Sequence, residues 1–371
     1  MLEEDKLVKE RNYGVDLLRI ISMYMIMTLH VMSNGGSLLE HQVNTYHTQV
    51  ILLLTFFNNV AVNLFALISG YVGIKAKRKA KRIIELWLQV LFFSWGIMLF
   101  FLLFLPQYLN HFQELASIFP TLSKQYWYFN AYLLLFILMP IINNGIKKLN
   151  KSQFSKLCLL LFIITSCIGG IFYQDSFALN NGFSGIWLII MYIFGAYLKQ
   201  YGLKIKPNLS LLMYLMASIL GAVIVNLTVI GSNGYSSGKV LYDNWFKWFN
   251  YNNPIMVINA ILLFWVFVNI NIKGRYTIGF IEHISTLAFG TYLLQTNYIV
   301  YAWFKGRYAY FYDKNILFML FLILLTALGW FILGSIVEAI RQYAFRKLKI
   351  VSFVTKLLKK PMVHLKMFDK N

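Results

Sequence analysis

Long apolar stretches separated by short polar segments recur along the whole chain. A helix needs about 20 predominantly apolar residues to cross the hydrocarbon core of a bilayer. Ten stretches approach this length, and each is predicted to be a transmembrane helix. They lie at residues 15–32, 50–72, 84–105, 127–142, 157–172, 183–198, 209–230, 254–270, 285–304 and 316–338. The pattern therefore predicts an all-α fold, a polytopic membrane helical bundle of about ten transmembrane helices.

Basic residues are concentrated in every second connecting segment. Residues 75–82 carry six Lys and Arg, whereas residues 33–49 and 173–182 carry none. Cytoplasmic loops of membrane proteins carry the excess of Lys and Arg, so this alternation predicts that both chain ends are cytoplasmic. The two later outer segments do carry basic residues. They hold Lys239, Lys247, Lys305, Arg307 and Lys314.

Composition supports a membrane protein. Hydrophobic residues make up 59% of the 371 positions and charged residues 13%, which is too little polar surface for a soluble domain of this size. The formal net charge of +20 could indicate nucleic-acid binding. Because the positive charge lies mainly in the inner segments, it is better explained by membrane topology and by binding of anionic lipids. No nucleic-acid partner is expected.

The last segment differs from the rest of the chain. Residues 1–340 are predicted to form one membrane domain, and residues 341–371 a basic, amphipathic cytoplasmic tail. In this tail, basic residues alternate with apolar ones such as Phe345 and Phe353. A helix lying on the inner leaflet fits that pattern. A disordered basic tail is the alternative.

The first predicted helix carries three ionisable residues, Asp16, Arg19 and His30. Ionisable groups inside a membrane span are costly and are therefore candidates for function. Asp16 and Arg19 are three residues apart and can form an ion pair on one helix face. Arg19 and His30 share a face and are separated by about 16 Å along the axis. Alternatively, Arg19 reaches the lipid headgroups and His30 is an interfacial residue.

This face suggests a path across the membrane. A guanidinium at the inner end could bind the phosphates of a cytoplasmic donor. A neutral imidazole at the outer end could accept the proton of an acceptor hydroxyl.

An Arg, ten residues and a His on the first of ten helices are also a family signature. Together with the shorter motifs, Arg19 and His30 make the chain resemble the acyltransferase-3 family of integral membrane acyltransferases. The shorter motifs resemble family segments in order along the chain, and they lie at residues 63–71, 127–132, 192–198 and 289–294. The resemblance covers the chain from about residue 11 to residue 341.

The resemblance implies a function. It implies transfer of an acyl group, commonly acetyl, from cytoplasmic acyl-CoA to a hydroxyl of a cell-surface polysaccharide or a lipid-linked sugar. His30 would be the essential catalytic residue, and Arg19 would contact the CoA end. Acyl-CoA is then a co-substrate and no metal is expected. Modification of surface glycans suggests a bacterial plasma membrane.

Further residues are expected to bind substrate or CoA. Arg78 and Arg82 would add phosphate contacts, although loop charge alone can explain both. Gln295 stands where the family often has a His, and its amide could bind but could not act as a base. The remaining candidates are Asp16, Asn63, Ser69, Trp127 and Asn130. A polysaccharide transporter, flippase or polymerase without acyl chemistry is the alternative function.

Overall fold

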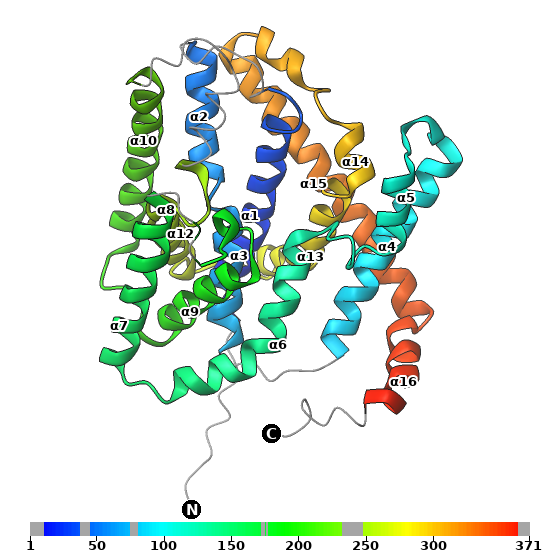
Figure 1. Cartoon of the computed structure of the whole chain (residues 1–371), viewed down its shortest axis with the longest axis horizontal. Coiled ribbons are helices and arrows are strands. Elements are labelled where there is room, and N and C mark those ends of the chain that lie inside the picture. The colour runs from blue at the N-terminus through cyan, green and yellow to red at the C-terminus, as the bar shows by residue number, and fades with distance from the viewer. Residues whose placement is uncertain are drawn as a thin grey trace, which may run out of the picture.

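The protein is a bundle of helices. The computed structural model describes residues 11–37, 45–74, 81–171, 175, 177–231 and 248–362, and its regular elements are all helical (Figure 1). The prediction of an all-α membrane bundle is therefore confirmed.

The first helix, α1 (Tyr13–Met32), lies at the centre of the bundle (Figure 1). It packs against α3 (Ala61–Gly73), α12 (Pro254–Val268), α13 (Arg275–Gln295) and α15 (Ile316–Lys347). Twelve of its residues are buried. A helix that carries ionisable groups is thereby kept away from lipid.

The predicted span 50–72 is divided into two helices, α2 (Tyr46–Asn58) and α3. At the junction, the buried Asn59 amide donates a hydrogen bond to the carbonyl of Phe249. Together α2 and α3 are 28 residues long, enough to cross a membrane.

Helices α3 and α9 (Gly185–Tyr201) approach each other very closely. A Cβ on Gly70 would lie 2.0 Å from the Tyr192 carbonyl oxygen, and one on Gly195 would lie 2.1 Å from that of Leu67. Small residues allow such backbone contact between membrane helices. Only glycine fits at these two positions.

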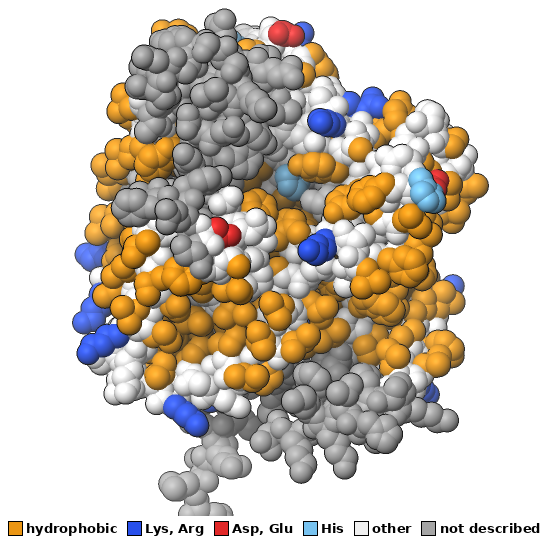
Figure 2. Space-filling model, viewed as in Figure 1, with side chains coloured by type: hydrophobic (Ala, Val, Ile, Leu, Met, Phe, Trp, Pro, Cys, Tyr) orange, Lys and Arg blue, Asp and Glu red, His pale blue; other side chains and the backbone are white. Residues whose placement is uncertain are grey.

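The peripheral helices carry an apolar outer surface. Leu317 on α15 is 80% exposed and Leu103 on α4 (Lys81–Phe104) is 66% exposed. Hydrophobic side chains cover much of the described surface in Figure 2. Among the described residues, seven helices are long and apolar enough to cross a membrane: α1, the α2–α3 pair, α4, α6 (Trp127–Lys147), α7 (Lys151–Leu161) with its continuation, α10 (Pro207–Gly231) and α15. These surfaces identify an integral membrane protein.

The other three predicted spans correspond to α9, α12 and α13, so a total of ten spans stays a prediction. The predicted bounds of the ninth span, 285–304, are wrong. Helix α13 begins at Arg275, and a break at Thr296 and Asn297 separates it from α14 (Tyr298–Trp303). The first turns of α13 carry polar side chains, which lower the mean hydropathy there, so the apolar pattern did not predict a helix over these residues.

A π-helix continues α7. It covers Phe162–Ile168 and leads into α8 (Gly169–Ile171). The wider turn leaves the carbonyl of Thr165 to accept a hydrogen bond from the Asn252 amide, at 3.4 Å. π-Helical turns of this kind are uncommon and often lie near functional sites.

Two further helices lie outside the predicted spans. Helix α5 (His111–Ile118) is closed by a capping box formed by Asn110 and Gln113. Helix α16 (Ile350–Met362), in the predicted tail, packs against α4 and lies at the lower edge of Figure 1. Three short 3-10 segments complete the described chain: Pro106–Tyr108, Asn180–Gly182 and Ala309–Asp313.

Candidate active site

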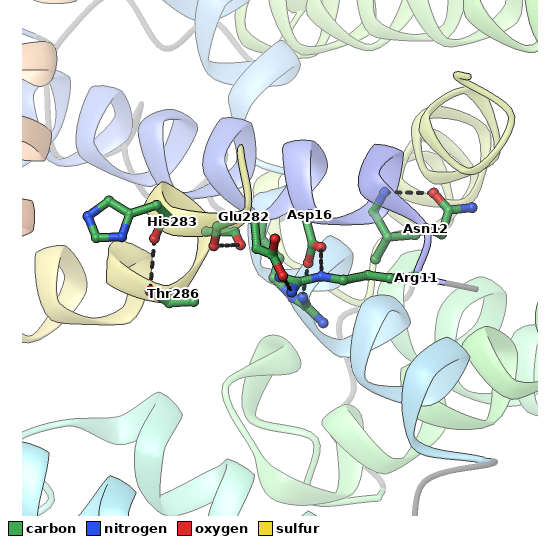
Figure 3. Close-up of polar contacts among 9 residues, drawn as sticks. Arg11, Asn12, Asp16, Glu282, His283 and Thr286 are labelled. Atoms are coloured by element: carbon green, nitrogen blue, oxygen red, sulfur yellow. Dashed lines mark hydrogen bonds and ion pairs between the residues drawn. The ribbon is translucent and has the colours of Figure 1, made fainter. Parts of the chain in front are cut away.

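A cluster of four charged side chains lies at the N-terminal end of α1, which is predicted to be the inner end. The carboxylate of Asp16, 3% exposed, pairs with Arg19 on α1 and with Arg11 at 2.6 Å. Arg11 also pairs with Glu282 on α13, and Figure 3 shows it extended between the two carboxylates. Partial burial lowers the pKa of Arg11, but the hydrogen bond and charge of Asp16, with Glu282, leave that pKa raised. Both oxygens of Asp16 are thus occupied by guanidinium groups.

Arg19 keeps free donors. Its side chain is 30% exposed, and beyond Asp16 it donates to no other described residue. Arg82, an exposed residue at the start of α4, and Tyr132 on α6 lie within electrostatic range of Arg19. Two guanidinium groups therefore interact electrostatically, and both are at least partly exposed. Arg78 lies outside the described residues.

The C-terminal end of α1, predicted to be the outer end, carries His30, which the fold places beside the last residue of α13. His30 Nδ1 lies 2.8 Å from Gln295 Oε1. The imidazole also packs edge-on against Tyr301 of α14, with ring centroids 5.7 Å apart. His30 and Gln295 are 265 residues apart in sequence, so only the fold brings them together.

This contact determines which nitrogen of His30 can act as a base. The amide oxygen of Gln295 can only accept a hydrogen bond, so Nδ1 carries the hydrogen. Nε2 then keeps its lone pair and can accept a proton. The amide nitrogen of Gln295 is buried and has no partner among the described residues, which leaves it free to donate to a ligand.

The loop after α13 is held firmly around this pair. Asn297 caps α14 by accepting from the Ile299 N–H, and its amide donates to the Tyr126 hydroxyl at 3.1 Å. On the other side, the amide of Asn34 donates to the Tyr301 carbonyl at 2.7 Å. These bonds tie the end of α1 to α14 and fix His30 between them.

The two polar ends of the α1 face are separated by apolar packing. Met23 and Ile26 lie between Arg19 and His30 on this face and are 2% and 7% exposed. Ser22 is also buried here, and its hydroxyl has no partner among the described residues. Between its two polar ends, this face of α1 is therefore closely packed and mostly apolar.

Asn63 and Trp127 belong to a separate network. Asn63 accepts from Trp187 Nε1 at 2.8 Å and donates to the Tyr251 carbonyl at 2.8 Å. The Trp127 ring stacks on that of Tyr251 at 6.3 Å. No described hydrogen bond joins this network to His30 or Arg19.

Ser69 and Asn130 make local bonds. The Ser69 hydroxyl donates to the Phe65 carbonyl one turn earlier on α3, at 2.8 Å. The Asn130 amide donates to the Thr121 carbonyl at 2.8 Å, and its own oxygen is buried without a described partner. Neither residue contacts His30 or Arg19.

Three neighbours of the site were not anticipated from the sequence. Arg11 and Glu282 resemble ordinary loop charges, and Tyr301 resembles a residue of an interfacial aromatic belt. Only the opposite charges at the inner ends of two helices could have suggested the Arg11–Glu282 pair. No group of three or more His, Cys, Asp or Glu that could hold a metal ion occurs among the described residues.

A family model described as an acyltransferase domain, that of the acyltransferase-3 family, matches residues 12–335. The chain belongs to this family. The protein is therefore a membrane acyltransferase, and the match favours the enzyme over a transporter or polymerase. No curated protein sequence and no solved structure shows a significant match to the chain.

In this acyltransferase the matched region contains both ends of the α1 face and Gln295. It stops before the last turns of α15, where Glu338 and Arg341 form a buried ion pair at 2.6 Å. It also stops before α16. Apart from Arg11, which precedes the match by one residue, the candidate active site thus lies inside the part of the chain that defines the family.

Proposed function

We propose that the protein transfers an acyl group, most simply acetyl, from cytoplasmic acyl-CoA to a hydroxyl of a cell-surface polysaccharide or lipid-linked sugar, at a bacterial plasma membrane. The observation that carries this proposal is the His30–Gln295 contact at the outer end of α1. It leaves an imidazole nitrogen with a free lone pair beside a buried, unpartnered amide donor. General-base catalysis of acyl transfer needs such a nitrogen.

The reaction follows from this geometry. His30 Nε2 takes the proton of the acceptor hydroxyl while the hydroxyl oxygen attacks the thioester carbonyl. The tetrahedral intermediate then collapses, the carbon–sulfur bond breaks, and the imidazolium returns the proton to the departing CoA thiolate. The Gln295 amide N–H is a candidate donor to the oxygen of the intermediate. An ester and free CoA are the products.

The inner guanidinium groups would bind the donor. In the proposal, Arg19 and Arg82 contact the phosphates of CoA, and Arg78 adds to them from the same basic segment. Asp16 orients Arg19 through their ion pair. Both oxygens of the Asp16 carboxylate are already paired with guanidinium groups, and its negative charge would repel a phosphate, so Asp16 itself does not bind the donor. The thin, flexible pantetheine arm would then pass Met23 and Ile26 to bring its thioester to His30.

The remaining candidates would shape the interior. Asn63 has both its donor and its acceptor occupied, so it holds the wall formed by Trp187 and Tyr251. Ser69 supports the same helix. In the proposal, Trp127 and the unpartnered oxygen of Asn130 contact the acyl group or the acceptor.

The proposal is tested by His30→Ala in cells, with His283→Ala as the matched control. His283 is exposed on α13 and points away from the charge cluster (Figure 3). Loss of the general base is expected to reduce O-acylation of the surface glycan by about 10²–10⁴-fold. The control is expected to retain it. NMR of the purified glycan measures the ester content, and unchanged content in His30→Ala at normal protein level would reject the catalytic role.

A further inference from the structure

An open groove lies next to the candidate active site, between α5 and α14. Its volume is about 440 Å³. Two of its lining residues, Asn34 and Tyr301, also border the catalytic His30. Asn34 follows one turn after His30, and Tyr301 both lines the groove and packs edge-on against the imidazole. A molecule in the groove would therefore have its nearest atoms one side chain away from His30.

The groove has an aromatic wall. The rings of Phe112 on α5 and Tyr298 on α14 stack at 6.0 Å with an interplanar angle of 21°. Phe112 is nevertheless 65% exposed. The face of an aromatic ring is electron-rich and attracts polarised C–H groups, such as those on one side of a pyranose ring. An exposed ring of this kind suits a sugar better than a purely apolar ligand.

Amide groups provide hydrogen bonds beside this wall. Asn110 and Gln113 use their side-chain oxygens in the α5 capping box, at 2.9 and 3.1 Å from the backbone N–H groups. Their NH₂ groups donate to no described residue and remain available along the groove. Asn34 has the opposite arrangement. Its NH₂ group donates to the Tyr301 carbonyl, and its side-chain oxygen is available as an acceptor. Paired donors and acceptors of this kind match the hydroxyl groups of a sugar.

The groove is also positively charged. Lys305 lines it, and Arg307 lies two residues further on, over the rings of Trp303 and Tyr108 at 4.4 and 5.6 Å. The nearby Glu114 is the one acidic residue on α5, and its carboxylate lies 3.7 Å from the His111 ring and outside the groove lining. Topology does not explain two basic residues here, because the loop-charge pattern places this end of the bundle outside. Their position suggests a ligand with negative charge.

We propose that the α5–α14 groove binds the acyl acceptor, and that the acceptor is an acidic glycan whose carboxylate or phosphodiester pairs with Lys305. This inference rests on the proposed function, which it extends by naming the acceptor class and its site. The sugar ring stacks on Phe112 and Tyr298. Its hydroxyl groups bind the amides of Asn110 and Gln113, and a hydroxyl passes Tyr301 to reach His30 Nε2.

Binding of two probes to the purified full-length protein tests the groove. Tetragalacturonate and α-1,4-galactotetraose have the same sugar configuration, linkage and number of units, and they differ in their carboxylates. The wild type is expected to bind tetragalacturonate at least about fivefold more tightly at low salt. Lys305→Glu is expected to remove this preference, and Phe112→Ala to weaken both probes. Lys314→Glu makes the same change at an exposed position outside the groove and should keep the preference.

The outcomes separate the two proposals. Equal binding of both probes by the wild type, binding of neither, or a preference that survives Lys305→Glu would overturn the groove assignment. Release of CoA from acetyl-CoA by the wild type tests the proposed function on its own. A wild type that releases CoA but shows no preference refutes only the acidic acceptor. A wild type that prefers the acidic probe but never releases CoA refutes the acyl-transfer proposal.

Discussion

Gln295 is a neutral side chain that orients the imidazole of His30, the candidate general base. In many hydrolases a carboxylate orients the catalytic imidazole and stabilises its charged form. Here an amide oxygen makes the orienting contact with Nδ1 at 2.8 Å and adds no charge. The imidazole is thus oriented by a dipole in an apolar setting. The expected cost is a weaker stabilisation of the imidazolium during the reaction.

The contact between Gln295 and His30 should be needed for full turnover. Gln295→Leu should lower kcat by roughly 10–100-fold, because the tautomer with a free Nε2 is no longer selected. Gln295→Glu should retain more activity, because its carboxylate can accept the same Nδ1–H. Both are measured as acetyl-CoA-dependent acylation by purified protein. Equal activity of Gln295→Leu and wild type would contradict the role of the contact.

The second prediction concerns the inner guanidinium groups. Arg19→Gln should raise the KM for acetyl-CoA by roughly ten- to hundredfold, since a charged hydrogen bond to phosphate is lost. Arg275→Gln, an exposed change at the start of α13, is the control and should leave KM unchanged. Steady-state kinetics with purified protein measure both. A loss confined to kcat in Arg19→Gln would instead place this residue at the reacting atoms.

Among the elements, the α3–α9 pair shows packing that depends on the absence of side chains. Gly70 and Gly195 each face a backbone carbonyl of the other helix. Helix α3 also carries Asn63, and α9 carries its partner Trp187. The close approach of the two helices therefore brings Asn63 next to Trp187, and Asn63 in turn binds the carbonyl of Tyr251.

Gly195→Ala is expected to destabilise the bundle by about 1–3 kcal/mol, because an added methyl group overlaps the Leu67 carbonyl. Gly96→Ala on α4 is the matched control, since a Cβ there meets nothing within 4 Å. The melting temperature in detergent, followed by tryptophan fluorescence, compares the two. A Gly195→Ala variant as stable as Gly96→Ala would show that α3 and α9 can separate.

Element prediction from the sequence depended on apolar length. It located α1, α4 and α10 closely, because each carries a long apolar run. It misplaced α13, whose polar first turns pack against the charged start of α1. It also missed α5, whose eight residues are too short to cross a membrane.

The site was predicted less completely for a related reason. Arg19, His30 and Asp16 are recognisable because they lie on one helix with known periodicity. The contacts to Gln295 and Tyr301 join residues more than 260 positions apart, and only tertiary packing shows them. Periodicity within a helix therefore identified the candidates and the Asp16–Arg19 pair, but not the partners on other helices.

At the scale of the whole molecule, the proposed reaction requires a defined orientation. Arg19 and His30, the proposed donor and acceptor positions, lie at opposite ends of α1, and the loop charges predict that the Arg19 end is cytoplasmic. The bundle would then deliver an acyl group outward without moving CoA across the membrane.

Cysteine labelling tests this orientation. In a background with Cys158 and Cys167 replaced by Ser, Lys314→Cys should react with an impermeant maleimide in intact cells. Lys148→Cys, in the loop after α6, should react only after the membrane is permeabilised. Both positions are exposed, so a difference reports their side of the membrane. The reverse pattern would invert the proposed path.

The enclosure of α1 has a consequence for biosynthesis. This helix leaves the ribosome first, yet Glu282 and Gln295 follow about 270 residues later. At a synthesis rate of about 5–20 residues per second, roughly 13–50 s pass between the synthesis of α1 and that of these partners. During this interval its charges face lipid or the insertion machinery. The active site is thus completed only after α13 is made, and a chain truncated before α13 would present Arg11 without Glu282 and His30 without Gln295 to cellular quality control.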